Sequence, residues 1–470
     1  MENCVNLKKG AEIIVDIDSL AFGGKGLARY NNIVVFVRNG IPGQKLKVLI
    51  IKKSKNYFES KILEIITESK HYQKPPCEHF TYCGGCSFQN LDYTIQTNQK
   101  SNQIKDVFNR IGFQKDFDVA PIRICDDNYH YRNKMEFTFS NRRWILKNEP
   151  ENVKSDFALG LHIPGRYDKI LNINECHIQS NEANEILNIV QKNTLNMAPY
   201  DIIAHTGFLR NLIIRHAKNT NEIMVNIVTA SENTQALQPI VEQIIKKVEN
   251  VKSIVNNVTA RKAGVSTGEY EITLYGESFI QETINGLTFN ISSNSFFQTN
   301  TKQTEILYSM IIEESKLSGN EIIYDLYCGT GTIGIAMAQY AKYIYGFEIN
   351  ESAVNDAIEN AKINTIKNIK FFKGDLQNIF RVNLDTEKLE KPDIIIIDPP
   401  RAGMHKKTIL DITEKRPKKI VYISCNPSTQ ARDIKELSEY HYSLKKILPL
   451  DMFPHTPHVE NIAILEKSYE

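Results

Sequence analysis

Beyond about residue 286 the chain alternates short apolar runs with helical segments, and this rhythm limits the possible fold more than any other feature. The apolar runs cover residues 321–324, 343–347, 368–372, 393–397 and 419–423. The helical segments between them cover about 332–341, 351–363 and 405–414. Such alternation predicts a parallel sheet with helices on both of its faces. We therefore expect an α/β domain whose ligands bind at the carboxyl ends of its strands.

Three glycines follow the first of these runs in a G-x-G-x-x-G pattern, Gly329, Gly331 and Gly334. The pattern is weak evidence alone, but its place between a strand and a helix is the required context. Glu348 ends the next run, where an acid can hydrogen-bond the hydroxyls of a ribose. Both a dinucleotide and S-adenosylmethionine fit these features. An acid just before the loop, Asp325, favours S-adenosylmethionine, because its carboxylate can approach the methionine ammonium.

Cys425 stands two residues beyond the apolar run 419–423, at the expected ligand-binding edge of the sheet. A thiol there can act as a nucleophile if its pKa falls below the free value of about 8.5. An inert buried cysteine is the alternative, and it is the common case. The residue alone does not decide between the two.

The neighbouring motifs favour a nucleophile. Asp398, two prolines and Arg401 follow the fourth run, whereas methyltransferases that act on amino groups usually carry an aromatic residue where Arg401 stands. C5 of uracil attacks a methylsulfonium only after a thiolate has added to C6, and a base must then remove the C5 proton. Glu460, before the last apolar run at 461–465, is a candidate base, because half-burial would raise its pKa. The alternative for Glu460 is a charged residue that caps a strand.

The first 66 residues are expected to form a small, OB-like closed β-barrel. Short alternating runs are separated by Gly-rich turns, as in barrels that bind oligonucleotides. Residues 1–70 hold 12 Lys/Arg against 7 Asp/Glu, which fits contact with nucleic acid, although a solvated surface explains it equally well. A helix is expected at 91–112, and mixed α+β patterns follow, so the predicted domains are 1–66, 74–285 and 286–470.

Six motifs together resemble the RNA 5-methyluridine methyltransferases of the TrmA/RumA (RlmD/RlmCD) family. They occur in the family's order and approximate spacing at residues 296–300, 325–331, 346–348, 398–401, 424–427 and 451–460. The resemblance implies a Rossmann-like methyltransferase domain with Cys425 as nucleophile and Glu460 as base. It also implies an N-terminal TRAM module, and a segment at 91–120 that can pack with the catalytic domain. The residues that it implies for S-adenosylmethionine binding are Gln298, Tyr327, Glu348 and Asp398.

Four cysteines suggest a metal site in the central domain. Cys77, Cys83 and Cys86 form a C-x5-C-x2-C pattern, and Cys176 follows far downstream. Four thiolates hold either zinc or an iron–sulfur cluster, but zinc ribbons usually show two C-x2-C pairs and this chain has one. The family resemblance implies a [4Fe–4S] cluster. The C-x3-C-x2-C pattern of radical enzymes is absent, so we expect a structural or RNA-binding role.

The same resemblance bears on substrate and location. Bacterial enzymes that methylate the T-loop of tRNA usually lack both barrel and cluster, so the resemblance favours 23S rRNA, with tRNA as the alternative. A non-enzymatic iron–sulfur RNA-binding factor would lack the nucleophile and the base, and both are present. With 41% hydrophobic and 24% charged residues, no stretch approaches the ~20 apolar residues of a membrane span. No signal peptide is evident, so we expect a cytoplasmic protein.

Overall fold

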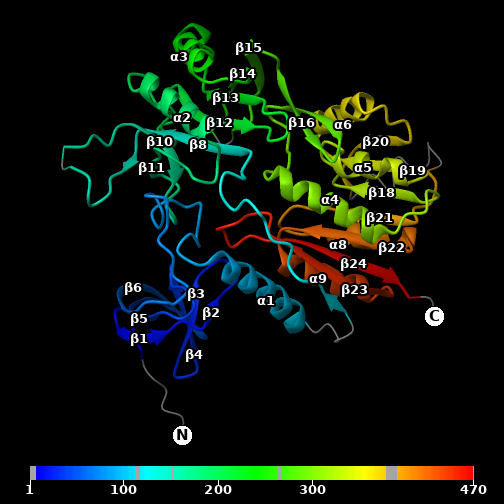
Figure 1. Ribbon diagram of the computed structural model, residues 1–470, viewed down its shortest axis with the longest axis horizontal. Helices are drawn as coiled ribbons and strands as arrows, with labels where there is room; N and C mark the ends of the chain where they lie inside the picture. The colour runs from blue at the N-terminus through cyan, green and yellow to red at the C-terminus, as the bar shows by residue number, and fades with distance from the viewer. Residues whose placement is uncertain (1–6, 112–116, 151, 263–265, 377–388, 469–470) are drawn as a thin grey trace.

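The chain forms three bodies of secondary structure (Figure 1). A computed structural model describes residues 7–111, 117–150, 152–262, 266–376 and 389–468. Among these residues no helix is both long and apolar enough to cross a membrane.

The N-terminal body is one six-stranded sheet in the order β1-β5-β6-β4-β3-β2. Its strands are β1 (Glu12–Asp16), β2 (Ser19–Leu20), β3 (Gly26–Tyr30), β4 (Ile33–Arg38), β5 (Lys45–Lys53) and β6 (Tyr57–Thr67). Alternate side chains from five of them form one apolar cluster, so the sheet curls around its own core. The sequence predicts a closed barrel, but in the described residues the hydrogen-bonded order leaves β1 and β2 as edges. We call this sheet the N-terminal barrel, since barrels of the OB type are also partly open.

The central body is an eight-stranded sheet in the order β15-β14-β13-β12-β8-β10-β11-β9. Its strands are β8 (Lys134–Ser140), β9 (Arg143–Trp144), β10 (Ala158–His162), β11 (Ile170–Asn172), β12 (Leu209–His216), β13 (Ile223–Thr229), β14 (Val251–Val258) and β15 (Tyr270–Gly276). Helices α2 (Asn181–Thr194) and α3 (Thr234–Lys247) cover one face, where apolar residues of both helices and the sheet form a single cluster. A hairpin of β16 (Phe279–Ile284) and β17 (Leu287–Ser292) leads on to the last body.

The C-terminal body is an eight-stranded sheet in the order β20-β19-β18-β21-β22-β24-β23-β7. Its strands are β18 (Ile322–Leu326), β19 (Tyr343–Glu348), β20 (Ile369–Lys373), β21 (Ile394–Ile397), β22 (Lys419–Ser424), β23 (Tyr442–Leu450), β24 (Glu460–Lys467) and the short β7 (Asp118–Val119). The first five strands in this order are parallel, as the sequence predicts, and each lies within two residues of its expected position. β24 pairs antiparallel with both β22 and β23, so the sheet is mixed.

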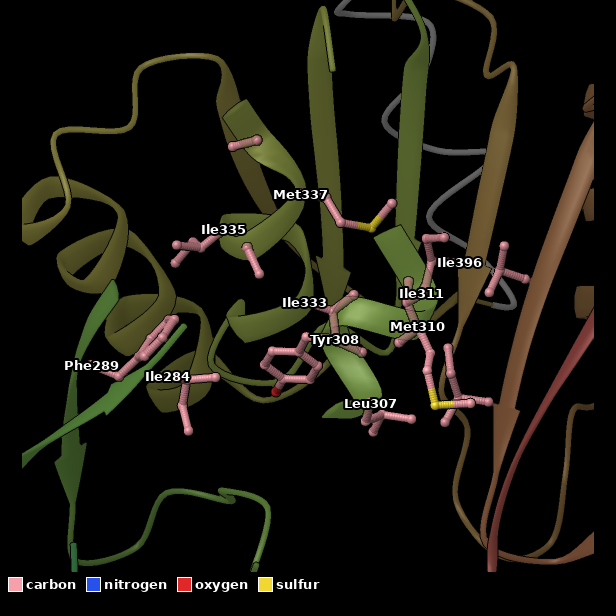
Figure 2. Close-up of a cluster of buried hydrophobic side chains, with 14 of the residues drawn as sticks. Ile284, Phe289, Leu307, Tyr308, Met310, Ile311, Ile333, Ile335, Met337 and Ile396 are labelled. Atoms are coloured by element: carbon pink, nitrogen blue, oxygen red, sulfur yellow. The ribbon is translucent and has the colours of Figure 1, made fainter. Parts of the chain in front are cut away.

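Helices cover both faces of this C-terminal sheet. They are α1 (Tyr93–Ile111), α4 (Thr301–Ser315), α5 (Thr332–Met337), α6 (Glu351–Ile363), α8 (Lys406–Lys415) and α9 (Pro427–Ser438), with a 3-10 turn at Ala338–Tyr340. Figure 2 shows the core on one face, where Tyr308, Ile311 and Ile333 pack together.

Helix α1 covers the opposite face, although it lies far upstream of β18 in the sequence (Figure 1). Ile104 and Phe108, one helical turn apart, are buried in the same cluster as residues of α8, α9 and the sheet. Burial of each such side chain stabilises the fold by about 1.5–3 kcal/mol. Helix α1, which precedes the central body in the sequence, is therefore an integral layer of the C-terminal body.

Candidate active site

The glycine-rich loop between β18 and α5 is held in a conformation that most side chains could not adopt. Gly329 and Gly331 have φ values of +53° and +76°. A Cβ on Gly331 would lie 2.7 Å from the ring of Phe371 and 2.9 Å from the side chain of Ala357. Space is open beside Gly329, where a Cβ would meet no atom within 4 Å. The loop can therefore admit a ligand closely against its backbone.

Two acids frame this loop. Asp325 is 1% exposed and accepts a hydrogen bond from the Gly334 amide at 3.0 Å, while its other oxygen, Oδ1, has no partner among the described residues. Burial raises the pKa of Asp325 to about 7, and the charges of Asp398 and Glu348 add to the shift. Glu348 accepts hydrogen bonds from the amides of Gly329 at 3.1 Å and Asn350 at 2.8 Å. Both carboxyls thus lie at the loop, on adjacent strands.

The other predicted cofactor residues lie on separate elements. Tyr327 directly follows β18 with a φ of 62°, a rare value for a large side chain. Burial raises the pKa of its phenol. Gln298 lies two residues before Asn300, the N-cap of α4, and its carbonyl accepts a hydrogen bond from Asn133 at 2.9 Å. The contact ties the Gln298 segment to the central body.

Strand register brings the predicted nucleophile and base together. β22 and β24 are antiparallel neighbours, and Ser424 pairs directly with Asn461. The next residue on each strand at this edge is Cys425 on one side and Glu460 on the other. Opposite residues of antiparallel strands lie with their Cβ atoms about 4.5–5.5 Å apart. The sequence places these two residues 35 positions apart, and only the pairing makes them neighbours.

Burial and the neighbouring acids shift the pKa of the Cys425 thiol in one direction, and Arg401 shifts it in the other. Burial raises its pKa, the charge of Glu460 raises it further, and Arg401 lowers it through its charge and a hydrogen bond. Cys425 also lies just before the N-cap of α9, Asn426, where the helix dipole favours an anion. The thiol therefore lies among groups that both favour and oppose its ionisation.

Asp398 and Glu460 are the two acids near Cys425, and burial raises the pKa of both. Burial raises the pKa of Asp398 to about 7. Burial first, and then the charge of Asp398, raise the pKa of Glu460 well above its usual range, while Arg401 opposes the shift. The sequence predicts a half-buried glutamate, but Glu460 is 4% exposed. A carboxylate in such surroundings binds a proton more strongly than one in water.

Sequence patterns alone missed a side chain of α9 that hydrogen-bonds to both β22 and β24 near Cys425 and Glu460. Gln430 of α9 donates hydrogen bonds to the carbonyls of Tyr422 at 2.8 Å and Asn461 at 3.1 Å. Its side-chain oxygen accepts a hydrogen bond from Asn461 at 2.6 Å. The sequence patterns predict no helix after Cys425, so nothing in them indicates Gln430.

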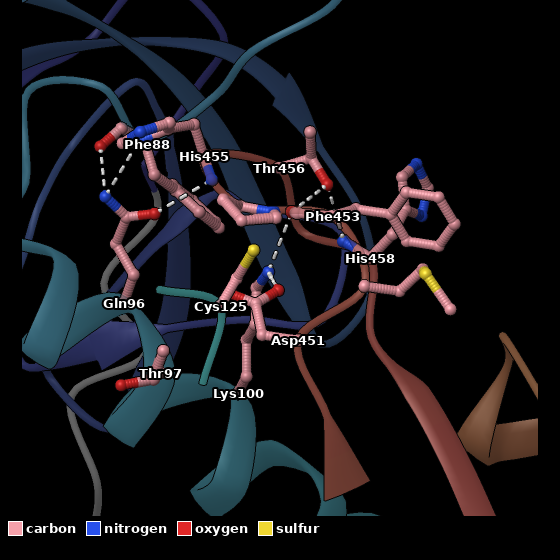
Figure 3. Close-up of polar contacts among 12 residues, drawn as sticks. Phe88, Gln96, Thr97, Lys100, Cys125, Asp451, Phe453, His455, Thr456 and His458 are labelled. Carbon is pink, nitrogen blue, oxygen red and sulfur yellow. Dashed lines mark hydrogen bonds and ion pairs between the residues drawn. The ribbon is translucent and has the colours of Figure 1, made fainter. Parts of the chain in front are cut away.

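The segment between β23 and β24, residues 451–459, carries much of the last predicted motif and leads directly into Glu460. Figure 3 shows how it lies against α1, with Lys100 and Gln96 pointing toward it. Lys100 forms a buried ion pair with Asp451 at 2.6 Å, and Gln96 contacts His455. We call residues 451–459 the base-bearing loop. Nothing in the local sequence pattern predicts these partners.

The four predicted metal ligands lie around one cavity against β8 and β10 of the central sheet. Cys77, Cys83, Cys86 and Cys176 all line it, together with apolar side chains such as Met135. Burial raises the pKa of Cys83 and Cys86 to about 12 and raises those of the other two thiols. Across the described residues, no three His, Cys, Asp or Glu side chains converge closely enough to hold a metal ion. The iron–sulfur cluster therefore stays a prediction.

A sheet with five parallel strands, a glycine-rich loop after β18, a buried acid before that loop and a second acid ending β19 is typical of enzymes that bind a nucleotide cofactor, either a dinucleotide or S-adenosylmethionine. A family model described as tRNA (Uracil-5-)-methyltransferase matches residues 220–468, and a TRAM domain model matches residues 6–63. The chain belongs to this family of RNA uracil-5 methyltransferases. It is an S-adenosylmethionine-dependent enzyme that methylates uracil C5 in RNA.

Relatives that match over nearly their whole length agree with this assignment. An uncharacterised RNA methyltransferase of Chlorobaculum tepidum is 38% identical, over 91% of this chain and 90% of the relative. One from Porphyromonas gingivalis is 37% identical, over 97% of this chain and 100% of the relative. The crystal structure of a Pyrococcus abyssi tRNA (uracil-54, C5)-methyltransferase with S-adenosyl-L-homocysteine is similar with a TM-score of 0.74 and 28% identity. The match covers 96% of this chain and 100% of that one.

Proposed function

We propose that Cys425 and Glu460 carry out methylation of C5 of a uridine in 23S rRNA. The observation that carries this proposal is the pairing of Ser424 with Asn461, from which nucleophile and base follow as neighbours. Covalent activation of uracil needs one thiolate and one base at the same ring. The two residues satisfy that need from adjacent strands, so they have separate tasks at one site.

The Cys425 thiolate adds to C6 of the uracil, and the electron pair of the C5–C6 double bond becomes available at C5. C5 would accept the methyl group of S-adenosylmethionine, with the sulfonium S–CH3 bond breaking and S-adenosylhomocysteine leaving. Glu460 then removes the C5 proton, the C5–C6 double bond re-forms, and the thiolate leaves. Arg401, which hydrogen-bonds the sulfur, favours the thiolate at the start and at the end of this sequence. The raised pKa of Glu460 makes it a stronger base than a glutamate in water.

Residues at the glycine-rich loop fit the methyl donor. Oδ1 of Asp325, which has no hydrogen-bond partner within the described part of the chain, is a buried acceptor beside the loop, as the ammonium of S-adenosylmethionine requires. Glu348 is positioned at the end of β19 for the ribose hydroxyls. Tyr327, Gln298 and Asp398 complete the proposed set.

The cysteine cavity fits a [4Fe–4S] cluster better than a single ion. Such a cluster takes four cysteine thiolates, and four cysteines line this cavity. Because each thiolate binds a different iron atom, the sulfurs need not converge on one point. The Gly85 amide donates to the sulfur of Cys83 at 3.3 Å, which is the kind of contact that holds a cluster ligand in place. Bound there, the cluster would tie the 77–86 segment to Cys176.

The choice between rRNA and tRNA needs a separate experiment. The structure of the Pyrococcus abyssi tRNA enzyme is matched over its whole length, so a similar N-terminal body and central body occur in a tRNA enzyme. Their presence therefore does not exclude the tRNA T-loop, which is the second candidate substrate. We expect a deletion strain to lose 5-methyluridine from 23S rRNA and to keep it in tRNA. Loss confined to tRNA would reverse the substrate assignment.

Two variants test the chemistry. Cys425→Ala should lower the rate of 5-methyluridine formation by about 10⁴-fold or more, as removal of a nucleophile does in other enzymes. Glu460→Gln should instead trap a methylated covalent protein–RNA adduct, because addition and methyl transfer precede proton removal. Denaturing gel electrophoresis with labelled RNA detects the adduct. Methylation by Cys425→Ala, or no adduct with Glu460→Gln, would refute the proposed roles.

A further inference from the structure

One face of α1 carries three polar side chains that contact the base-bearing loop. Tyr93, Gln96 and Lys100 lie three and four residues apart, so they project from the same side of the helix. Lys100 is 1% exposed and its partner Asp451 is 0% exposed. The ammonium lies 2.6 Å from the Asp451 carboxylate and donates a second hydrogen bond to the Phe453 carbonyl at 3.1 Å. Figure 3 shows the lysine reaching from the helix to both groups.

The side chains of Tyr93 and Gln96 hold the loop at Asp451 and at His455. The Tyr93 hydroxyl donates to Asp451 at 2.9 Å and accepts from the Cys125 amide at 2.9 Å. Gln96 accepts a hydrogen bond from the His455 amide at 3.1 Å, and its side-chain nitrogen lies 3.1 Å from Nδ1 of the same histidine. His455 has a φ of 62°, so this backbone conformation needs support from its surroundings.

A buried ion pair is weak evidence for stability, because desolvation of both charges offsets their attraction. The Lys100–Asp451 pair is better explained by a requirement for one particular loop geometry. The loop runs from Asp451 to Val459, and the next residue is Glu460. A shift of about 1 Å in a catalytic group can lower a rate about 100-fold. The precise position of the loop thus matters more to the reaction than to folding.

We propose that Lys100 and Tyr93 are positioning residues that hold the base-bearing loop so that Glu460 reaches the C5 proton. The proposal rests on the proposed role of Glu460 as base. Loss of either contact leaves Cys425 between β22 and α9, because α1 packs on α9 through separate apolar residues, Ile104 and Phe108. The hydrogen bonds of Lys100 and Tyr93 go instead to Asp451, Phe453 and Cys125. Thiolate addition and methyl transfer then continue, whereas elimination slows. The distinctive consequence is accumulation of the methylated covalent adduct.

The test compares Lys100→Met and Tyr93→Phe with the wild type under multiple turnover. We expect kcat to fall about 10- to 100-fold for Lys100→Met and about 2- to 10-fold for Tyr93→Phe, which loses the hydrogen bonds to Asp451 and from the Cys125 amide. The KM for S-adenosylmethionine should change less than about twofold, since neither residue touches the glycine-rich loop. Adduct should accumulate in both variants.

Two controls match these changes. Tyr442→Phe removes a buried hydroxyl that donates to the Pro417 carbonyl at 3.0 Å, at the far end of β23. Gln103→Leu removes a contact from α1 to the Leu20 carbonyl of the N-terminal barrel, at 2.9 Å. Neither should accumulate adduct.

The outcomes separate this inference from the proposed function. Suppose that Glu460→Gln traps the adduct while Lys100→Met and Tyr93→Phe turn over more slowly and accumulate no adduct. In that case the positioning role of Lys100 and Tyr93 is wrong. If Glu460→Gln traps none, the base assignment itself fails. Lys100→Met leaves Asp451 buried and unpaired, so if it does not fold, Tyr93→Phe decides the question alone.

Discussion

Two groups of cysteines in this enzyme differ in what surrounds their sulfur atoms. Cys425 lies among charged groups, with Arg401 and two acids within electrostatic reach. The four cysteines of the central cavity lie among one another and mostly apolar side chains, although His79, Gln89, Glu175 and His177 also line the cavity. Burial raises the pKa in both groups, but a guanidinium hydrogen-bonds the sulfur of Cys425, whereas Arg132 acts on Cys176 through its charge alone.

The comparison shows how similar burial can serve different chemistry. A lone thiol that is hydrogen-bonded by a guanidinium can ionise for part of the time and act on a substrate. Four neutral thiols in a largely apolar cavity, with no guanidinium hydrogen-bonded to them, are better suited to lose their protons on binding a metal centre, which brings positive charge into direct contact with the sulfurs. The charges around a buried sulfur, more than the extent of its burial, therefore indicate whether the cysteine is suited to act as a nucleophile or as a metal ligand.

The largest effect should come from breaking the cysteine cavity. Cys176→Ala removes one proposed ligand, and we expect loss of absorbance near ~400 nm and a melting temperature lower by about 5 °C or more. Cys425 should still form the covalent adduct in the remaining folded protein. Anaerobic purification with iron analysis and thermal unfolding measures both effects.

Cys425→Ala provides the crossed control for that experiment. It should leave the absorbance and the melting temperature unchanged while methylation is lost. If wild-type protein purified anaerobically contains zinc in place of iron, the cluster assignment is overturned.

A smaller effect should follow from Arg401→Met. Arg401 lowers the pKa of Cys425, so its loss raises that pKa and reduces the thiolate fraction at neutral pH, by about tenfold whenever the pKa rises by one. In the wild type, alkylation of Cys425 by iodoacetamide should speed up as pH rises, since the thiol has a raised pKa. The variant should need a higher pH for the same rate. Lys406→Met, at an exposed lysine, is the matched control, and equal pH profiles in all three proteins would contradict the electrostatic role.

The smallest effect tests the acids of the charged edge. The folded pKa of Asp325 is about 7, above the unfolded value of about 3.9. The folded state therefore keeps a proton that the unfolded chain releases, so this group's contribution is complete below about pH 4 and is lost as pH rises through about 7. Asp325→Asn should be more stable relative to wild type at pH 8 than at pH 5, by about 1–4 kcal/mol.

Thermal unfolding without cofactor, at a series of pH values, measures that difference. The same variant should bind S-adenosylmethionine more weakly, because the amide cannot pair with an ammonium. A pH-independent difference in stability would show that Asp325 is ionised throughout.

Local sequence patterns were enough to locate the parallel strands and the acids that end them. Each apolar run is bounded by turn residues, and the glycine-rich loop needs backbone conformations that only a few residues adopt. Asp325, Glu348 and Cys425 could therefore be assigned to one edge of the sheet from the sequence. The mixed character of the sheet was missed, because β23 has no strong pattern of its own and its direction depends on β24.

The sequence by itself determined which chemical groups the enzyme carries and where its strands end, because these depend on short stretches of chain. Only the tertiary structure decided which groups meet. Lys100 and Asp451 are 351 positions apart, and a lysine on an amphipathic helix is indistinguishable locally from one that faces solvent. Contacts between distant segments depend on packing of whole layers, here α1 on the C-terminal sheet, and such packing leaves no periodic signal at either partner.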